Sequence, residues 1–556
     1  MKIKIGFLIF SIGAIIPIFY LSICIYFNKN LYSSFQIVND IYYGFLQGRS
    51  LDQKVYLAST YAITPFFLSL FLLVQGKNSK KYGFATWAKL KDIEKIGFSL
   101  KGGIPIANFN GKTIYIKDPR SVFIMATPGA GKTAGIAIPI LLTFKYSLIV
   151  TDIKGELYKL TSKFREMVLK NKIYCFSPYD KKNNTFKFNP FSKKIIKNFT
   201  FNERLRLVKE FSNVLFVKDK NADSHWIESA KDLFVFFAMY DITKYNESYL
   251  YELGRYPKKA AAELLNDDYM QQLEEAEEEG IIIDEMNLFL KQAAEDTELD
   301  PLVRDMARAA SRINRKEFQS IVTTYTRTLN VFTDYDVAEA TNDMSITYEA
   351  LRKENITIYL KMKEKDIPTL APLIRIFIEA VLQNLMDEEN SNPHECVPII
   401  ADEIIRFGKL EKLIEFPALS RSYNMPLYFI GQNEAQIKKY YSQDDLDIIS
   451  GTCAYNIYFA VNNEKEAERI SKSIGTFTRT KESESTQFNK ATGSKSKSDE
   501  GYSLVTAQDL LNLKKDEMII TVYGYKARPI KAKINFYFEN KKMQKLIKKY
   551  TLKETS

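Results

Sequence analysis

A chain of 556 residues is too long for a single compact core, so the sequence predicts several domains, or a domain with a membrane anchor. The formal net charge of +11 permits an anionic partner such as nucleic acid or an acidic membrane surface, without proving one. Four cysteines without paired spacing and only two histidines, His225 and His394, argue against a zinc site, a disulfide framework and imidazole-based catalysis.

The N-terminal segment, 1–76, has the pattern of a membrane anchor. Residues 5–27 carry no charge and are long enough to span a bilayer, and residues 55–74 form a second uncharged run. A cleaved signal peptide, for the first run, and a buried hairpin, for both, are the alternatives. Basic residues before the first run and after the second outnumber those in the connecting loop. The positive-inside rule therefore predicts that both termini and everything after about residue 76 lie in the cytoplasm.

Residues 121–140 predict a strand, a small-residue loop and the start of a helix. An apolar run, 122–125, precedes the loop, and a helical pattern follows it. This order is typical of a nucleoside triphosphate site, because glycines let the backbone N–H groups of the loop turn toward phosphate. Lys132 is expected to reach the β- and γ-phosphates, and the Thr133 hydroxyl to bind Mg²⁺. We predict that ATP is bound by Ala126, Thr127, Pro128, Gly129, Ala130, Gly131, Lys132 and Thr133.

Strands and helices alternate on both sides of a long interruption. After two short strands between 104 and the loop, the apolar pattern predicts further strands at 147–150, 172–177, 356–360, 397–401, 427–430, 454–460 and 518–522. Helices are predicted at 157–169 and 370–386. Strands that alternate with helices indicate an α/β fold with a mostly parallel sheet.

Residues 199–328 show helical periodicity and no strand signal, which indicates an all-α domain inserted into the α/β domain. We therefore expect the nucleotide-binding domain in two pieces, 77–198 and 329–540, followed by a basic C-terminal tail at 541–556. Residues 478–500 are rich in Ser, Thr and Lys and predict either a mobile surface loop or an edge hairpin.

Four basic residues of the insertion recur at the spacing of one helical face: Arg308, Arg312, Arg315 and Lys316. A solvated surface is the default interpretation of such a face, and contact with nucleic acid or a partner is the alternative.

ATP hydrolysis also needs a carboxylate that holds the hydrated Mg²⁺ and a base that orients water. Two predicted strand ends offer acids, one at Asp152 and one at Asp402 and Glu403. We choose Asp402 as the Mg²⁺ ligand and Glu403 as the base, because Asp152 has no neighbouring acid. Helix capping is the alternative role, and it has more weight for Asp152. The inserted domain explains why these acids lie so far along the chain from Lys132.

Two further residues are candidates for catalysis. Gln432 follows the strand predicted at 427–430, where it could sense the γ-phosphate and the attacking water, although a simple turn residue is the alternative. Arg421 could reach the nucleotide of a neighbouring subunit as an arginine finger. A surface role is the alternative for Arg421, and Arg375 competes for the same function.

Taken in order, several stretches resemble the type IV secretion coupling proteins, the TraG-like conjugation ATPases related to the FtsK/HerA translocases. The resemblance covers nearly the whole chain and includes GFATWAKLKDI, ATPGAGKTAGIAIPILL, VTDIKGELYKLT, VPIIADEIIRFGKLEKL, LSRSYNMPLYFIGQNEAQI and LVTAQDLLNL. The chain departs from the usual family pattern at Ile404 and Ile405 and in GFATWA, which concerns subtype more than activity.

The resemblance implies a membrane-anchored, RecA-like P-loop NTPase with an inserted all-α domain, assembled as a homo-hexamer around a channel. Such an ATPase would recruit a relaxase–DNA complex or secreted effector proteins through the inserted helices. It would deliver them to a type IV secretion channel at the bacterial inner membrane. A chromosome-type double-stranded DNA translocase and a non-hydrolysing nucleotide-binding membrane scaffold are the alternatives. Glu403 argues against the scaffold, which has no need of a base.

Overall fold

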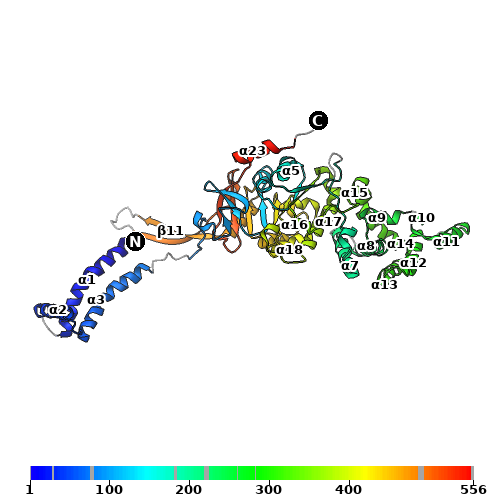
Figure 1. Cartoon of the computed structure of the whole chain (residues 1–556). Coiled ribbons are helices and arrows are strands. Elements are labelled where there is room, and N and C mark those ends of the chain that lie inside the picture. Colours follow the sequence, from blue (N-terminus) through cyan, green and yellow to red (C-terminus); the bar gives the residue numbers. More distant parts are fainter. Residues whose placement is uncertain are drawn as a thin grey trace. The chain divides into compact units, whose positions relative to one another are not determined.

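The computed structural model describes residues 2–27, 31–74, 81–180, 185–217, 224–259, 261–281, 283–485 and 494–552. These residues belong to two compact units. The first comprises Met1–Gly83 and Thr478–Gly501, and the second comprises Phe84–Phe477 and Tyr502–Ser556. Figure 1 shows the chain with many of its helices labelled.

The first unit contains three helices, α1 (Lys2–Phe27), α2 (Leu31–Leu46) and α3 (Gln53–Val74). Helix α1 packs on α3 through a small buried cluster of Ile23, Val55 and Ala58. Much of the remaining apolar surface is exposed, including Phe10 on α1 and Phe67 on α3. Large exposed apolar side chains of this kind are typical of helices that face lipid or another protein.

Among the described residues, one stretch is long and apolar enough to cross a membrane, Phe10–Phe27 in α1, and a signal sequence near an N-terminus has the same character. The second predicted span, 55–74, lies in α3. The side chains of this helix are described only as far as residue 69, and no second stretch of the described residues is both long and apolar enough to cross a membrane. The predicted two-helix anchor is therefore not confirmed.

A separate two-stranded sheet occupies most of the segment predicted as a loop or a hairpin. It consists of β11 (Thr476–Ser485) and β12 (Ser494–Ser503). The hairpin alternative is thus confirmed for the described residues. The two strands form a sheet of their own and are not the edge of a larger sheet, as an edge hairpin would be. Residues 486–493 of the predicted loop lie outside the described residues.

The second unit is built on a 12-stranded mixed sheet with the order β1-β3-β2-β14-β13-β10-β4-β9-β8-β5-β7-β6. Neighbouring strands from β10 to β6 are parallel, as predicted: β10 (Tyr455–Tyr458), β4 (Val122–Met125), β9 (Leu427–Gly431), β8 (Ile399–Asp402), β5 (Leu148–Asp152), β7 (Ile356–Lys361) and β6 (Lys172–Phe176). The remaining strands extend the sheet with antiparallel pairs: β13 (Glu517–Val522), β14 (Ile530–Lys533), β2 (Ile104–Phe109), β3 (Lys112–Ile116) and β1 (Phe98–Ser99). The α/β prediction is confirmed, with more antiparallel structure than expected.

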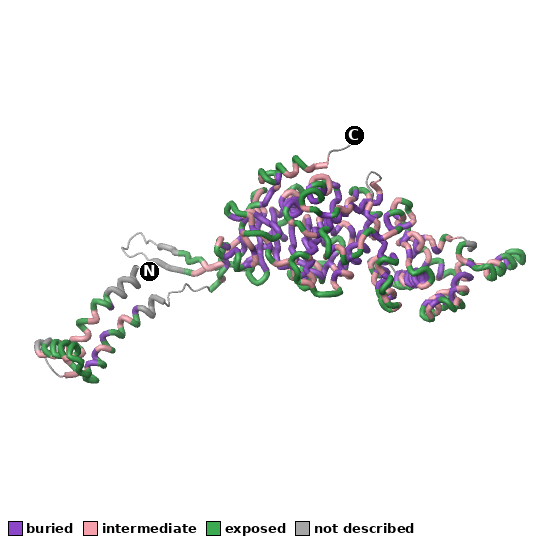
Figure 2. Tube along the Cα trace, in the orientation of Figure 1, coloured by how far each residue is buried: buried purple, intermediate pink, exposed green. Residues whose placement is uncertain are grey.

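Successive side chains of the parallel strands belong alternately to two buried clusters, one on each face of the sheet. On β4, Val122 and Ile124 belong to one cluster, whereas Phe123 and Met125 belong to the other. This alternation follows from the two-residue period of a strand. Helix residues complete each cluster, which gives the buried interior of this unit in Figure 2.

Helices cover both faces of this sheet. The first face is covered by α4 (Ile138–Thr143), α5 (Glu156–Met167) and α23 (Lys541–Tyr550), and the second by α17 (Ile367–Leu385), α18 (Glu411–Leu419), α20 (Gln443–Thr452) and α21 (Glu464–Ile474). Short helices α6 (Lys193–Ile196), α19 (Glu434–Ile437) and α22 (Ala507–Leu511) lie in connections. Helix α23 lies in the predicted C-terminal tail. Two residues after this helix, Leu552 N donates a hydrogen bond to Lys159 O of α5 at 3.0 Å, which holds the end of α23 beside α5.

The helical prediction for 199–328 is confirmed in its secondary structure, since the described residues of this range contain no strand. The helices are α7 (Phe201–Leu215), α8 (Ser224–Tyr245), α9 (Leu250–Arg255), α10 (Ala261–Leu264), α11 (Asp267–Glu278), α12 (Glu285–Glu295), α13 (Pro301–Ser311) and α14 (Arg315–Leu329). Helical structure continues through α15 (Tyr335–Ala340) and α16 (Ala350–Lys353). Apolar residues of α8 and of the sheet belong to one buried cluster. The domain boundaries at 198 and 328 stay predictions.

The prediction that Arg308, Arg312, Arg315 and Lys316 share one helical face is wrong. Helix α13 ends at Ser311, and Asn314 caps the start of α14 by accepting a hydrogen bond from Glu317 N at 3.0 Å. Arg308 and Arg315 therefore lie on different helices. All four basic residues are exposed, as the solvated alternative expects.

Candidate functional site

The loop predicted to bind phosphate joins β4 to a helix that begins at Thr133 with a π-helical turn, Thr133–Ala137, and continues as α4. Gly129 and Gly131 have φ angles of 77° and 82°, a left-handed conformation that glycine adopts without strain. Ala126 N donates to Gly431 O at 3.1 Å, which ties the loop to the end of β9. A Cβ added at Gly129 would meet no atom within 4 Å, so space is open above the loop.

The two acids at the end of β8 lie directly beside this loop. Lys132 Nζ is 3.2 Å from Asp402 Oδ1 and 3.1 Å from Glu403 Oε1. The Thr133 hydroxyl donates a hydrogen bond to Asp402 Oδ2 at 3.2 Å. The fold thus brings together the predicted phosphate ligand, the predicted Mg²⁺ ligands and the predicted base.

Gln432 joins this cluster because β9 lies between β4 and β8 in the sheet. Gln432 follows the last residue of β9, and its Nε2 donates to Glu403 Oε1. The site therefore occupies the carboxyl ends of three adjacent parallel strands, the edge at which open α/β sheets bind ligands.

Arg406 is a neighbour of Glu403 that the sequence interpretation missed. It lies on a short helical turn, Ile404–Phe407, and its Nη1 donates to Glu403 Oε2 at 3.2 Å. Its Nη2 donates to Glu364 Oε1 at 2.6 Å. The three-residue spacing from Glu403 was the available signal, since residues three apart in a helical turn are neighbours.

The two carboxylates have different electrostatic environments. Burial raises the pKa of Asp402, against the opposing charge of Lys132. Burial also acts to raise the pKa of Glu403, but Lys132, Gln432 and Arg406 together hold that pKa below its ordinary value. Glu403 is therefore an anion at neutral pH, as a base that accepts a proton from water must be.

Thr133 and Asp402 fit a Mg²⁺ ion in their chemistry. Both offer oxygen ligands, which Mg²⁺ prefers, and the buried Asp402 Oδ1 has no partner among the described residues besides its ion pair with Lys132. Mg²⁺ in nucleotide sites is bound by one or two protein oxygens, with phosphates and water as the other ligands. The absence of a larger His, Cys, Asp and Glu cluster from the described residues does not conflict with this.

Asp152, the competing acid, has the capping role. Its Oδ2 accepts a hydrogen bond from Tyr158 N at 2.8 Å in the first turn of α5. Burial raises its pKa to about 6. Asp152 contacts neither Lys132 nor Thr133 in any interaction that the described residues show.

The two arginines proposed as fingers do not reach the site of their own chain. Arg421 is exposed and precedes β9, so it lies at the edge of the sheet opposite Lys132. The guanidinium of Arg375 donates to Phe407 O at 3.0 Å and to Val214 O at 3.3 Å, which occupies it within the protein interior. A role of Arg421 toward a neighbouring subunit stays a prediction.

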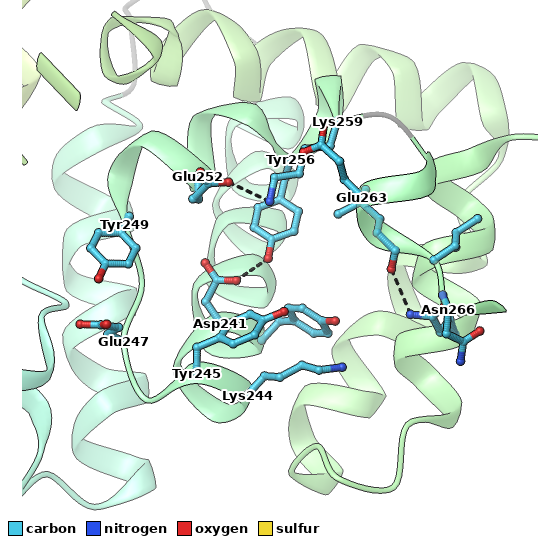
Figure 3. Close-up of a pocket in the computed structure, with 14 residues that line it drawn as sticks. Asp241, Lys244, Tyr245, Glu247, Tyr249, Glu252, Tyr256, Lys259, Glu263 and Asn266 are labelled. Atoms are coloured by element: carbon cyan, nitrogen blue, oxygen red, sulfur yellow. Dashed lines mark hydrogen bonds and ion pairs between the residues drawn. The ribbon is translucent and has the colours of Figure 1, made fainter. Parts of the chain in front are cut away.

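A cavity of about 450 Å³ lies elsewhere, among α8, α9, α10 and α12 (Figure 3). Tyrosine and acidic side chains line much of it, and none of the predicted nucleotide-site residues is among them. The buried Asp241 accepts hydrogen bonds from the Tyr256 hydroxyl and from Ser248 Oγ, and burial raises its pKa to about 6. The ammonium group of Lys259 pairs with Glu252 at 2.8 Å. This cavity is separate from the loop predicted to bind phosphate.

Comparison with known proteins places the chain in a family. Residues 86–556 match the model of the family described as type IV secretory system conjugative DNA transfer. The chain therefore belongs to this family of conjugative DNA-transfer proteins, and the resemblance to coupling proteins is confirmed.

Individual relatives are more distant. A VirD4 protein of Rhizobium radiobacter is 25% identical over 509 residues, which cover 87% of this chain and 67% of that protein. A conjugal transfer protein TraG of Escherichia coli is 26% identical over 440 residues, which cover 73% of this chain and 66% of that protein.

Solved structures of the conjugative coupling protein TrwB share the fold. The unbound form has a TM-score of 0.56 at 14% identity, covering 83% of this chain and 95% of TrwB. The form in complex with ADP and Mg²⁺ has a TM-score of 0.54 at 14% identity, covering 83% of this chain and 96% of TrwB. The second unit thus has a TrwB-like α/β fold with a mixed sheet.

Proposed function

We propose that this chain hydrolyses ATP to drive conjugative transfer, and that the cluster of Lys132, Asp402 and Glu403 is its catalytic centre. The observation that supports the proposal most directly is the ion pair between Lys132 and the two acids of β8, at 3.2 and 3.1 Å. Nucleotide and Mg²⁺ complexes of TrwB, which has the same fold, agree with it.

The residues have distinct roles in this proposal. Mg²⁺ supplies charge neutralisation at the phosphates when it is bound. The backbone N–H groups of residues 126–133 and the ammonium group of Lys132 bind the phosphates, and Thr133 and Asp402 hold the metal. Because Lys132 turns to the phosphates, Glu403 loses one of its partners and becomes free to accept a proton from the attacking water. The Gln432 amide orients Glu403 and that water.

The cargo that we propose is a relaxase–DNA complex or a secreted protein, passed to a type IV secretion channel by a homo-hexamer. The family match supports conjugative DNA transfer over a chromosome-type translocase. A formal net charge of +11 supports contact with nucleic acid. The helices between 199 and 328 would recognise the cargo, and the cavity of Figure 3 offers them a concave, partly acidic site.

We also propose that the first unit anchors the chain in the bacterial inner membrane with spans near 5–27 and 55–74 and both termini in the cytoplasm. The apolar stretch Phe10–Phe27 supports the first span. The packing of α1 on α3 and the exposed aromatic side chains of α3, such as Tyr61 and Phe67, support the second.

The test of hydrolysis compares Glu403→Gln with Glu415→Gln, an exposed glutamate on α18. We expect Glu403→Gln to bind ATP like the natural protein while its kcat falls by roughly 10²–10⁴-fold, the contribution of a general base. Steady-state ATPase assays with and without DNA, at several salt concentrations, give the measurement, and DNA stimulation should fall steeply with salt. Unchanged turnover in Glu403→Gln would remove Glu403 from the mechanism.

A further inference from the structure

The segment that follows β14 packs directly on the phosphate loop. A Cβ added at Gly131 would lie 2.4 Å from Phe536 Cε1, and one at Gly135 would lie 2.2 Å from Ile534 Cγ2. Tyr537 N donates a hydrogen bond to Ala134 O at 3.1 Å, on the first turn of the helix that follows the loop. Residues from near the C-terminal end of the sequence therefore form one wall of the nucleotide site.

Two aromatic rings of this wall are stacked on each other. The ring centroids of Phe536 and Phe538 are 4.7 Å apart, with an angle of 15° between the ring planes. Phe536 is 9% exposed, whereas Phe538 is 47% exposed. The backbone oxygen of Phe538 accepts a hydrogen bond from Gln544 Nε2 on α23, which holds this residue in place. The stack thus begins against the loop and ends in a half-exposed aromatic ring.

The order of the strands separates this stack from the catalytic carboxylates. On one side of β4 lie β9 and β8, which position Gln432, Asp402 and Glu403. On the other side lie β10, β13 and β14, and residues 534–538 leave β14 at the same edge of the sheet as the loop. The reacting phosphate must approach Glu403, so the nucleoside at the opposite end of the triphosphate is directed to the side of Phe536 and Phe538.

We propose that Phe538, supported from behind by Phe536, is the stacking platform for the base of the nucleotide that binds at the phosphate loop. The inference rests on the proposed nucleotide site and names the residue that recognises its base. Stacking on an aromatic face accepts any base, because every base has a π-face. The platform therefore distinguishes a nucleotide from a bare polyphosphate, and it does not distinguish adenine from guanine.

The test uses the full chain purified in mild detergent and measures binding by calorimetry in the presence of Mg²⁺, with ATP and inorganic tripolyphosphate as probes. Phe538→Leu keeps an apolar side chain and removes the aromatic face. We expect it to weaken ATP binding about tenfold, the effect of losing one base–aromatic stack, and to leave tripolyphosphate binding unchanged. Phe538→Trp should bind ATP as well as the natural protein, and its added tryptophan emission should change with ATP and not with tripolyphosphate.

Tyr523→Leu is the matched control, because Tyr523 is 62% exposed and lies on the β13–β14 turn, at the opposite edge of the sheet. Equal ATP affinity in Phe538→Leu and Tyr523→Leu overturns the platform. A parallel loss of ATP and tripolyphosphate binding in Phe538→Leu also overturns it, since that result shows a damaged loop. Failure of the natural protein to bind ATP at all would refute the proposed nucleotide site itself, a result distinct from both.

Discussion

The ammonium group of Lys132 lies 3.1 Å from Glu403 Oε1, although 271 residues separate the two in sequence. Lys132 has a side chain that is 11% exposed, and Glu403 one that is 18% exposed, so water screens this ion pair only weakly. A triphosphate in the loop would compete with Glu403 for the same ammonium group. The pair therefore links phosphate binding to the release of the proposed base.

Substitution of Lys132 by alanine should weaken ATP binding by roughly 10- to 150-fold, because a charge-assisted hydrogen bond contributes about 1.5–3 kcal/mol. Equilibrium binding of ATP with Mg²⁺ provides the measurement. Lys154→Ala is the control, since Lys154 is exposed on the turn between β5 and α5. Equal ATP affinity in the two variants would contradict a phosphate-binding role for Lys132.

Substitution of Arg406 by alanine should raise the pKa of Glu403, since Arg406 is one of the groups that lower it. A base must be deprotonated to act, so the acidic limb of the pH–rate profile should move to higher pH in Arg406→Ala. The profile of kcat between pH 4 and pH 8 gives the measurement. Arg312→Ala, at an exposed position after α13, should keep the natural profile. An unshifted limb in Arg406→Ala would show that Arg406 does not tune Glu403.

The losses of stability in Gly131→Ala and Gly129→Ala should differ, because both variants strain the backbone and only one creates a steric overlap. Both glycines have φ near +80°, so each alanine should cost about 1–2 kcal/mol in backbone strain. Only Gly131→Ala adds a Cβ within 2.4 Å of Phe536, and that overlap should cost about 1–3 kcal/mol more. Thermal unfolding without nucleotide should therefore give the lower Tm for Gly131→Ala. Equal Tm values would show that Phe536 moves away without cost.

Asp241→Asn should change how stability depends on pH. Burial raises the pKa of Asp241 from 3.8 to about 6, so the folded protein binds this proton more tightly than the unfolded chain does. The contribution of Asp241 to the free energy of unfolding therefore falls as pH rises from about 4 to about 6, by on the order of 3 kcal/mol, and stays constant above that range. Asparagine keeps an oxygen that can accept from Tyr256 and has no proton to lose.

The stability of Asp241→Asn relative to the natural protein should accordingly be higher at pH 7.5 than at pH 4.5. Denaturant unfolding at the two pH values gives the comparison, in which other buried acids such as Asp152 cancel because both proteins contain them. Asp268→Asn, exposed on α11, should show no such change. A difference that is the same at both pH values would show that Asp241 does not titrate in this range.

The local sequence pattern was sufficient to predict most helices and strands and the loop between β4 and the helix that starts at Thr133. The apolar run of β4 and the glycines at 129 and 131 specify a strand, a loop and a helix start through interactions between near neighbours in sequence. For the same reason the helical character of residues 199–328 was predictable. The error at Arg308 and Arg315 was also local in origin, because periodicity alone does not reveal that Asn314 caps a new helix.

Strand order decided which residues meet, and strand order depends on contacts between distant parts of the chain. Asp152 and Asp402 both end apolar strands. Only β9 separates β8 from β4, so Asp402 and Glu403 reach Lys132, whereas Asp152 on β5 lies one strand farther away. The antiparallel β13 and β14 bring Phe536 onto the loop, and no feature of residues 121–140 indicates that neighbour. Residue types near the phosphate loop are readable from sequence because their chemistry is local, whereas the partners of Lys132 and Gly131 follow from the packing of the whole sheet.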